Sequence, residues 1–127
     1  MDRTSAKNEG VSSLNIKFIG ELREIERSGS TGFLGELIDL FLKEAGVHLA
    51  RLRNSLALKD AGAFERTAHT LKGSSGNLGA TGMSGMCAEL QTIGHETDWT
   101  RAAEILPRLE AEFQTVKADL LAEKERS

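Results

Sequence analysis

A stripe of apolar residues with helical spacing is the feature that most restricts the fold of this chain. Between positions 34 and 56, apolar residues recur at intervals of three or four. This spacing places them on one face of an α-helix, which other parts of the chain must cover. A long amphipathic helix is therefore expected over about 31–58, ending at the turn residues 59–62. The stripe consists of Leu34, Ile38, Phe41, Ala45, Leu49, Leu52 and Leu56.

Similar patterns predict four more helices. Asp60 and Asp98 are expected as N-caps because a carboxylate accepts a backbone N–H at a helix start. Gly79 is expected to end the third helix, since glycine adopts the left-handed conformation found after helix C-termini. Short turns and one apolar stripe per helix predict an all-α fold, an antiparallel four-helix bundle with an additional short N-terminal helix. The further helices are expected at about 18–25, 61–78, 81–94 and 98–123.

Length and composition narrow the domain organisation and the function classes. With 127 residues the chain is one domain's worth of sequence. We expect a disordered lead-in or linker over 1–13, the bundle over 14–122 and a frayed tail over 123–127. A net charge of −3 disfavours nucleic-acid binding. The single cysteine excludes a disulfide framework and a multi-cysteine zinc site. No apolar run suits membrane insertion or a secretory signal, so a cytoplasmic location is expected.

The segment 68–79 carries the candidate chemistry. On a helix, His69, Lys72, Gly73 and Gly76 form one stripe, centred roughly 140° from the apolar side of the same helix. His69 is therefore expected to point into solvent, with Lys72 one turn away. The residues expected to face the core are Phe64, Ala68, Leu71, Ser75 and Leu78.

This outer stripe suits phosphoryl transfer. An exposed imidazole is largely neutral and nucleophilic near pH 7, and an ammonium one turn away attracts a phosphoryl group. Each glycine inside a helix costs about 1 kcal/mol relative to alanine. Two glycines on an exposed stripe have no packing reason, but they allow another surface to approach the imidazole. The alternative is an ordinary surface histidine without a chemical role.

The run from His69 to Gly79, HTLKGSSGNLG, resembles the signature of the histidine-containing phosphotransfer (HPt) domain family. That signature is His-x-Leu-Lys-Gly followed by small residues and a later glycine. Residues 33–42 are similar to the second helix of the family, 87–91 to its fourth and 109–113 to its last. The resemblance spans about Leu14 to Leu121.

The resemblance implies a relay function. His69 would accept a phosphoryl group at Nε2 from the aspartyl phosphate of a receiver domain and pass it to another receiver in a two-component phosphorelay. Lys72 would stabilise the phosphoryl group. Gln91, at the matching position of the fourth helix, would bond the imidazole Nδ1 and direct Nε2 outward.

The resemblance also implies partners. Response-regulator receiver domains would dock beside His69, with Gly73, Gly76 and Thr70 bordering the contact. The chain itself would hold no cofactor, because the receiver's carboxylates supply the Mg²⁺. Residues 51–80 carry five basic and two acidic residues, a local charge of +3 that suits an acidic partner. We expect a monomer, because the helices can cover their own apolar stripes.

Two alternatives stay open from the sequence. One is a non-catalytic helical module that only binds other proteins. The other concerns context, because the chain could be the C-terminal domain of a hybrid sensor kinase. No nucleotide-binding motif is present, so neither ATP binding nor autokinase activity is expected. Metal binding is not expected either, since the Glu-x-x-His pairs of a di-iron bundle are missing.

Overall fold

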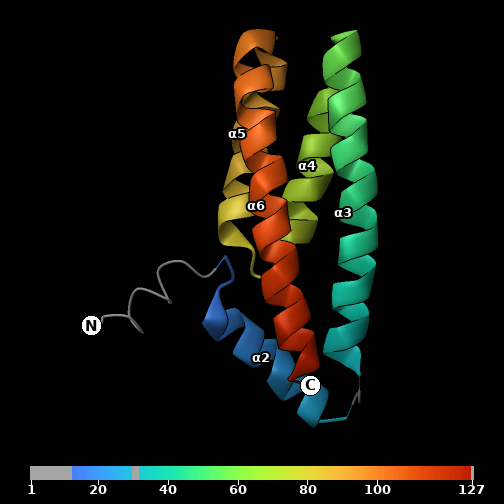
Figure 1. The fold of residues 1–127 in the computed structure, drawn as a ribbon, viewed down its shortest axis with the longest axis vertical. Coiled ribbons are helices and arrows are strands. Elements are labelled where there is room, and N and C mark those ends of the chain that lie inside the picture. The colour runs from blue at the N-terminus through green and yellow to red at the C-terminus, as the bar shows by residue number, and fades with distance from the viewer. Residues whose placement is uncertain (1–12, 30–31, 127) are drawn as a thin grey trace, which may run out of the picture.

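The computed structural model describes residues 13–29 and 32–126. In Figure 1, α3 and α5 run upward and α4 and α6 run downward, while α2 crosses the lower end of the bundle. The described residues contain no strand. This arrangement confirms the predicted antiparallel bundle with an additional N-terminal helix. The helices are α2 (Ile16–Arg27), α3 (Phe33–Leu58), α4 (Ala61–Asn77), α5 (Thr81–His95) and α6 (Trp99–Glu125).

Each bundle helix packs against its two neighbours. Close backbone approaches join α3 to α4, α4 to α5, α5 to α6 and α6 to α3. Among the described residues, none joins the diagonal pairs α3–α5 and α4–α6. The most extensive contact lies between α4 and α5, where the backbone of Gly94 meets the ring of Phe64. A Cβ on Gly94 would lie 2.7 Å from Phe64 Cδ1, so the close approach depends on glycine.

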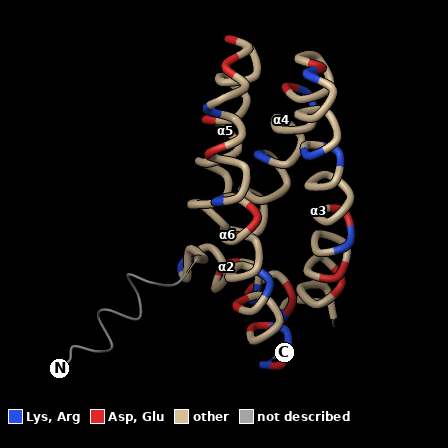
Figure 2. The backbone as a smooth tube through the Cα atoms, turned by 45° about the horizontal axis from the view of Figure 1, so that its top comes forward, with Lys and Arg blue, Asp and Glu red and all other residues tan. Residues whose placement is uncertain are grey.

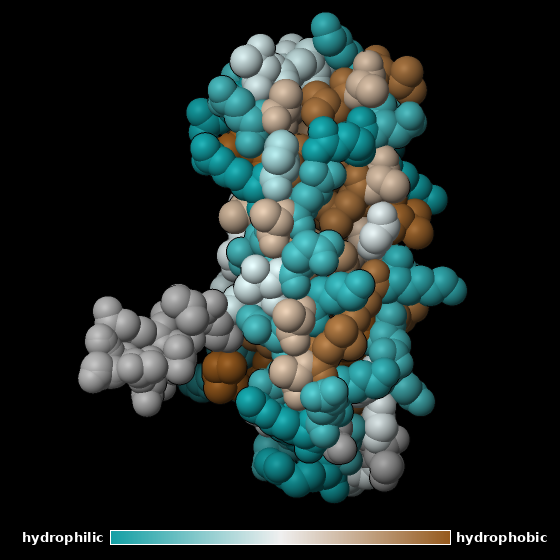
Figure 3. All heavy atoms as spheres, viewed as in Figure 1, coloured by the Kyte–Doolittle hydropathy of each residue, from teal (hydrophilic) through white to brown (hydrophobic). Residues whose placement is uncertain are grey.

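The predicted apolar stripes form the core. On α3, the stripe from Leu34 to Leu52 is buried, and Leu56 packs against the core from its edge. Figure 3 shows apolar side chains along a seam between α6 and α3, flanked by hydrophilic side chains. Burying one face of each helix is what the alternating three- and four-residue spacing required.

Both ends of the described bundle make polar contacts that the sequence did not indicate. The lead-in was expected over 1–13, but Ser13 is buried, and its N–H and hydroxyl donate to Asp119 Oδ2 at 3.1 and 2.7 Å. Residues 1–12 lie outside the described part of the chain. The frayed tail was expected from Glu123, but α6 continues to Glu125 and Glu123 is only 7% exposed. The tertiary structure supplies Glu123 with cationic partners.

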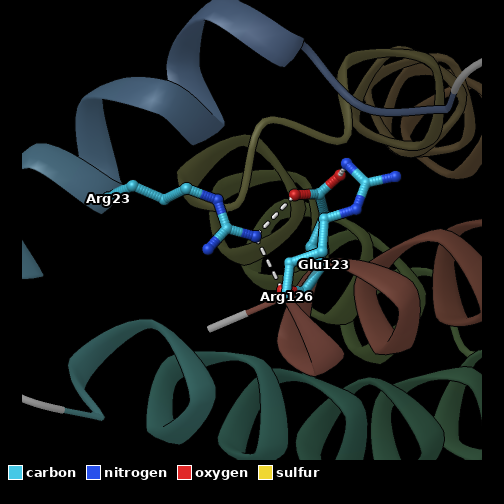
Figure 4. A network of polar contacts seen from close by, with 3 residues as sticks. All are labelled: Arg23, Glu123 and Arg126. Atoms are coloured by element: carbon cyan, nitrogen blue, oxygen red, sulfur yellow. Dashed lines mark hydrogen bonds and ion pairs between the residues drawn. The ribbon is translucent and has the colours of Figure 1, made fainter.

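These partners come from α2 and from the C-terminal end of α6. Arg23 on α2 donates to Glu123 Oε1 at 2.7 Å and to the Glu123 backbone carbonyl at 2.6 Å (Figure 4). Arg126 donates to the second carboxylate oxygen at 3.2 Å. The same carbonyl, in the last turn of α6, also accepts the Arg126 backbone N–H at 3.1 Å. The cluster therefore ties α2 to the end of α6.

The substitution Glu123→Ala should lower the free energy of unfolding by about 1–2 kcal/mol, because a largely buried Arg23 guanidinium loses its carboxylate. Urea denaturation followed by circular dichroism would measure this change. Glu110→Ala is the matched control, since it removes the exposed pair between Arg53 and Glu110 and should cost at most about 1 kcal/mol. Equal losses in the two variants would contradict the structural role given to Glu123.

Candidate functional site

Two end signals fix the extent of α4, the helix that carries the candidate site. At its start, the Asp60 carboxylate accepts the Ala63 N–H at 3.1 Å. At its end, Gly79 adopts φ 76°, and its N–H donates to the Gly76 carbonyl at 3.0 Å. The next N–H, from Ala80, reaches the Ser75 carbonyl at 2.9 Å. Both ends therefore form as the sequence predicted.

The two faces of α4 also separate as predicted. Phe64, Ala68, Leu71 and Ser75 are 0% exposed and face the core. His69 lies on the opposite side and is exposed. The Ser75 hydroxyl is satisfied inside the helix, since it donates to the Leu71 carbonyl at 2.7 Å. The rotation of α4 thus presents the imidazole to solvent without exposing apolar side chains.

Gln91 on α5 lies opposite His69. Its Oε1 is 3.4 Å from His69 Nδ1, although 22 residues separate the two in the sequence. Gln91 is half-buried, so its amide approaches the imidazole from the α4–α5 contact. An amide oxygen can only accept a hydrogen bond, so this pairing favours the tautomer with the proton on Nδ1. In that tautomer the lone pair lies on Nε2.

Lys72 and the two glycines have different surroundings. The Lys72 backbone carbonyl accepts from Ser84 Oγ on α5 at 2.9 Å. Gly73 faces open space, since a Cβ there would meet nothing within 4 Å. A Cβ on Gly76 would lie 3.5 Å from Ser84 Oγ, in ordinary contact. Neither position therefore requires glycine for packing, as expected, although Gly76 lies against α5 and Gly73 does not.

The surface is hollowed on both sides of His69. Thr70 lines both hollows, while its hydroxyl donates to the Arg66 carbonyl of its own helix at 3.0 Å. The hollow towards α5 is lined by Glu65, Arg66, His69, Thr70 and Gln91. The hollow towards α3 is lined by Lys43, Glu44, Val47, His48, Arg51 and Thr70.

Comparison with known proteins agrees with this geometry. A family model described as the Hpt domain matches residues 36–119. The chain belongs to the Hpt domain family. Its structure superposes on that of histidine-containing phosphotransfer protein B (HptB) from Pseudomonas aeruginosa PAO1 with a TM-score of 0.83 and 28% identity, covering 92% of this chain and 98% of that one.

A curated relative extends the comparison to plants. This Hpt domain is 23% identical over 103 residues to histidine-containing phosphotransfer protein 2 of Arabidopsis thaliana. The match covers 79% of this chain and 66% of the plant protein, so the chain spans slightly less than two thirds of that relative's length. The family and fold are therefore established, whereas the individual roles of His69, Lys72 and Gln91 remain predictions.

The other histidines of the Hpt domain have different surroundings. His48 is partly buried, and its Nδ1 has no hydrogen-bond partner in the described part of the chain. His95 is exposed, with Nδ1 3.4 Å from Glu65 Oε1. Glu65 and His95 thus face each other across α4 and α5, one turn from His69 and Gln91 respectively. This second pair was not evident from the sequence, because it depends on the register between the two helices.

Other reactive groups of the Hpt domain are sparse in the described residues. No three or more His, Cys, Asp or Glu side chains there converge on a point suitable for a metal ion. Cys87 is fully buried, and burial raises the pKa of its thiol to about 12, which keeps it protonated and unreactive. In the same residues, no helix is both long enough and apolar enough for a membrane crossing.

Proposed function

We propose that this chain is a phosphorelay intermediate that accepts a phosphoryl group on His69 from a receiver-domain aspartyl phosphate and passes it to a second receiver. The observation that carries the proposal is the exposed imidazole of His69 with Gln91 Oε1 at its Nδ1, on the helix matched by the Hpt family. The family supports a histidine phosphotransfer role. The choice of atom and partner is our inference.

The transfer requires no proton to move. The Nε2 lone pair attacks phosphorus in line, the bond from phosphorus to the aspartyl oxygen breaks, and the aspartate leaves as a carboxylate. The imidazole becomes an N-phosphorylated imidazolium that still carries its Nδ1 proton. Gln91 Oε1 accepts from this Nδ1–H throughout. In the second transfer, a carboxylate oxygen of another receiver attacks phosphorus and the neutral imidazole returns.

Neighbouring groups have supporting roles in this scheme. The Lys72 ammonium, one turn from His69, balances the charge of the phosphoryl group. The open surface at Gly73 provides room for the receiver, and Thr70 and Gly76 border the contact. The receiver's own carboxylates hold the Mg²⁺ that neutralises the transferred group, so no cofactor is assigned to this chain.

The cellular context is also part of the proposal. We place the chain in the cytoplasm as a monomer that contacts response-regulator receivers, either free-standing or as the C-terminal part of a hybrid sensor kinase. It has neither ATP-binding nor autokinase activity in this scheme. The competing function is a helical module that binds partners without accepting phosphate.

Phosphate transfer followed by NMR tests the proposal. Receiver domains carrying aspartyl phosphate are mixed with the ¹⁵N-histidine-labelled chain. The expected product is an acid-labile, base-stable phosphate on Nε2 of His69, with Nδ1 protonated. Gln91→Leu should weaken the preference for the Nδ1–H tautomer in the unphosphorylated chain. A wild-type chain that binds receivers but gains no phosphate would support the binding module, and phosphate on Nδ1 would refute the role of Gln91.

A further inference from the structure

Two arginines that form no ion pair within the described residues lie beside His69. Within the described residues, Arg51, Arg66 and Arg108 form no ion pair, and Arg51 and Arg66 line the two hollows next to His69. Arg108 lies on α6, the helix diagonal to α4. The remaining described arginines, each paired with a glutamate, are Arg23, Arg27, Arg53, Arg101 and Arg126.

The two arginines line different hollows next to His69, Arg66 the one towards α5 and Arg51 the one towards α3. On α4, Gly73 and Arg66 are rotated from His69 by about 40° and 60° in the direction of α3. Thr70 continues in that direction and lines the hollow to which Arg51 on α3 contributes. Gln91 occupies the opposite side, on α5. A partner that covers His69 from the side of α3 therefore lies near both Arg66 and Arg51.

The side chains that line the two hollows carry a net positive charge. Figure 2 shows basic positions along both α3 and α4. Lys43 joins Arg51 in the α3-side hollow, where Glu44 is the only carboxylate among the lining residues. In the other hollow, the carboxylate of Glu65 is engaged by His95. The net charge of the whole chain is −3, so this basic area contrasts with the rest of the molecule.

An apolar side chain accompanies the free cations. Val47 lines the same hollow as Arg51 and is 46% exposed. Free anions gain little from an exposed valine, whereas a folded protein surface covers it and gains apolar burial. Since neither arginine is held in an ion pair within the described residues, a carboxylate of the partner can bind it without breaking such a pair. The combination therefore fits the acidic face of another protein.

We propose that Arg51 and Arg66 select the receiver by pairing with carboxylates on the rim of its phosphorylated pocket. This inference rests on the proposed function, because it assigns the docking contact of the same site. The two arginines accelerate encounter and set orientation, while His69 and Lys72 act on the phosphoryl group. They are specificity residues, and the chemical step proceeds without them once the receiver is bound.

Charge reversal separates docking from chemistry. Arg51→Glu and Arg66→Glu are made singly and together, and Arg108→Glu is the matched control with an equal change in net charge. Two phosphodonors are used: a phosphorylated receiver that labels the wild-type chain, and phosphoramidate, which has no protein surface. For the double variant, kcat/KM from the receiver should fall about tenfold or more at low salt, and the deficit should shrink at about 0.5 M salt.

The remaining rates should not move. Transfer at saturating receiver, labelling by phosphoramidate and all rates of Arg108→Glu should stay within about twofold of wild type, because none depends on electrostatic encounter at this face. A double variant as fast as wild type at low salt would overturn the proposal. So would an equal loss in Arg108→Glu, or an equal loss with phosphoramidate, which would mean that the arginines act on His69 itself.

Two further outcomes keep this inference distinct from the proposed function. If neither donor labels wild-type His69, the proposed function fails and the docking role falls with it. If both donors label His69 and the receiver labels the charge-reversed variants as fast as the wild-type chain, only the docking role fails. Sedimentation of the wild-type chain adds one more check, since a dimer that the double variant dissociates would assign these arginines to self-association and refute receiver selection.

Discussion

Replacing His69 with glutamine is expected to abolish phosphoryl acceptance and to leave the fold intact. The amide nitrogen of glutamine is not a nucleophile, so the transfer rate should fall by more than about 10³-fold. Because His69 is exposed and, among the described residues, its ring hydrogen-bonds only to Gln91 over a long distance, the free energy of unfolding should change by no more than about 0.5 kcal/mol. Radiolabel transfer from a phosphorylated receiver and urea denaturation measure the two effects.

His95→Gln is the matched control for this experiment. His95 is also exposed, and its Nδ1 also faces an oxygen acceptor on the adjacent helix, at the same distance of 3.4 Å. It lacks the lysine and the open glycine that flank His69. We expect His95→Gln to accept phosphate at the wild-type rate. Full labelling of His69→Gln, or loss of labelling in His95→Gln, would show that the phosphoacceptor has been misassigned.

A second large effect is expected from Gly94→Ala, which should lower the free energy of unfolding by about 2–3 kcal/mol. The added Cβ would lie 2.7 Å from Cδ1 of the fully buried Phe64 ring, and that ring is held edge-on against Trp99 with centroids 5.6 Å apart. The ring has little freedom to move, so α4 and α5 must separate. Urea denaturation of the variant and the wild-type chain gives the difference.

Gly85→Ala, on the same helix as Gly94, is the matched control and should raise the free energy of unfolding instead of lowering it. A Cβ on Gly85 would meet nothing within 4 Å, so alanine there adds only helix propensity and should stabilise the chain by up to about 1 kcal/mol. Gly94 lies one turn from Gln91, so the separation of α4 and α5 should also lengthen the contact between His69 and Gln91. A Gly94→Ala variant as stable as Gly85→Ala would refute the close approach of the two helices.

Much of this fold follows from the spacing of side chains along the chain. The spacing of apolar residues from Leu34 to Leu56 was sufficient to predict α3. Asp60 and Asp98 cap the starts of α4 and α6 as predicted, and Gly79 follows the end of α4 with a positive φ. The outward direction of His69 followed in the same way. A residue's angular position on a helix depends only on its sequence distance from the buried stripe, which is local information.

Contacts between helices depended on the tertiary structure. Gln91 could be matched to His69 only through family resemblance, and neither the pair of Glu65 with His95 nor the position of Arg51 was evident beforehand. The need for glycine at position 94 and the buried Glu123 were likewise not foreseen. Each depends on the relative rotation and axial register of two helices, which side-chain packing sets. A repeating apolar stripe fixes which face of a helix is buried, but it is compatible with several registers against a neighbour.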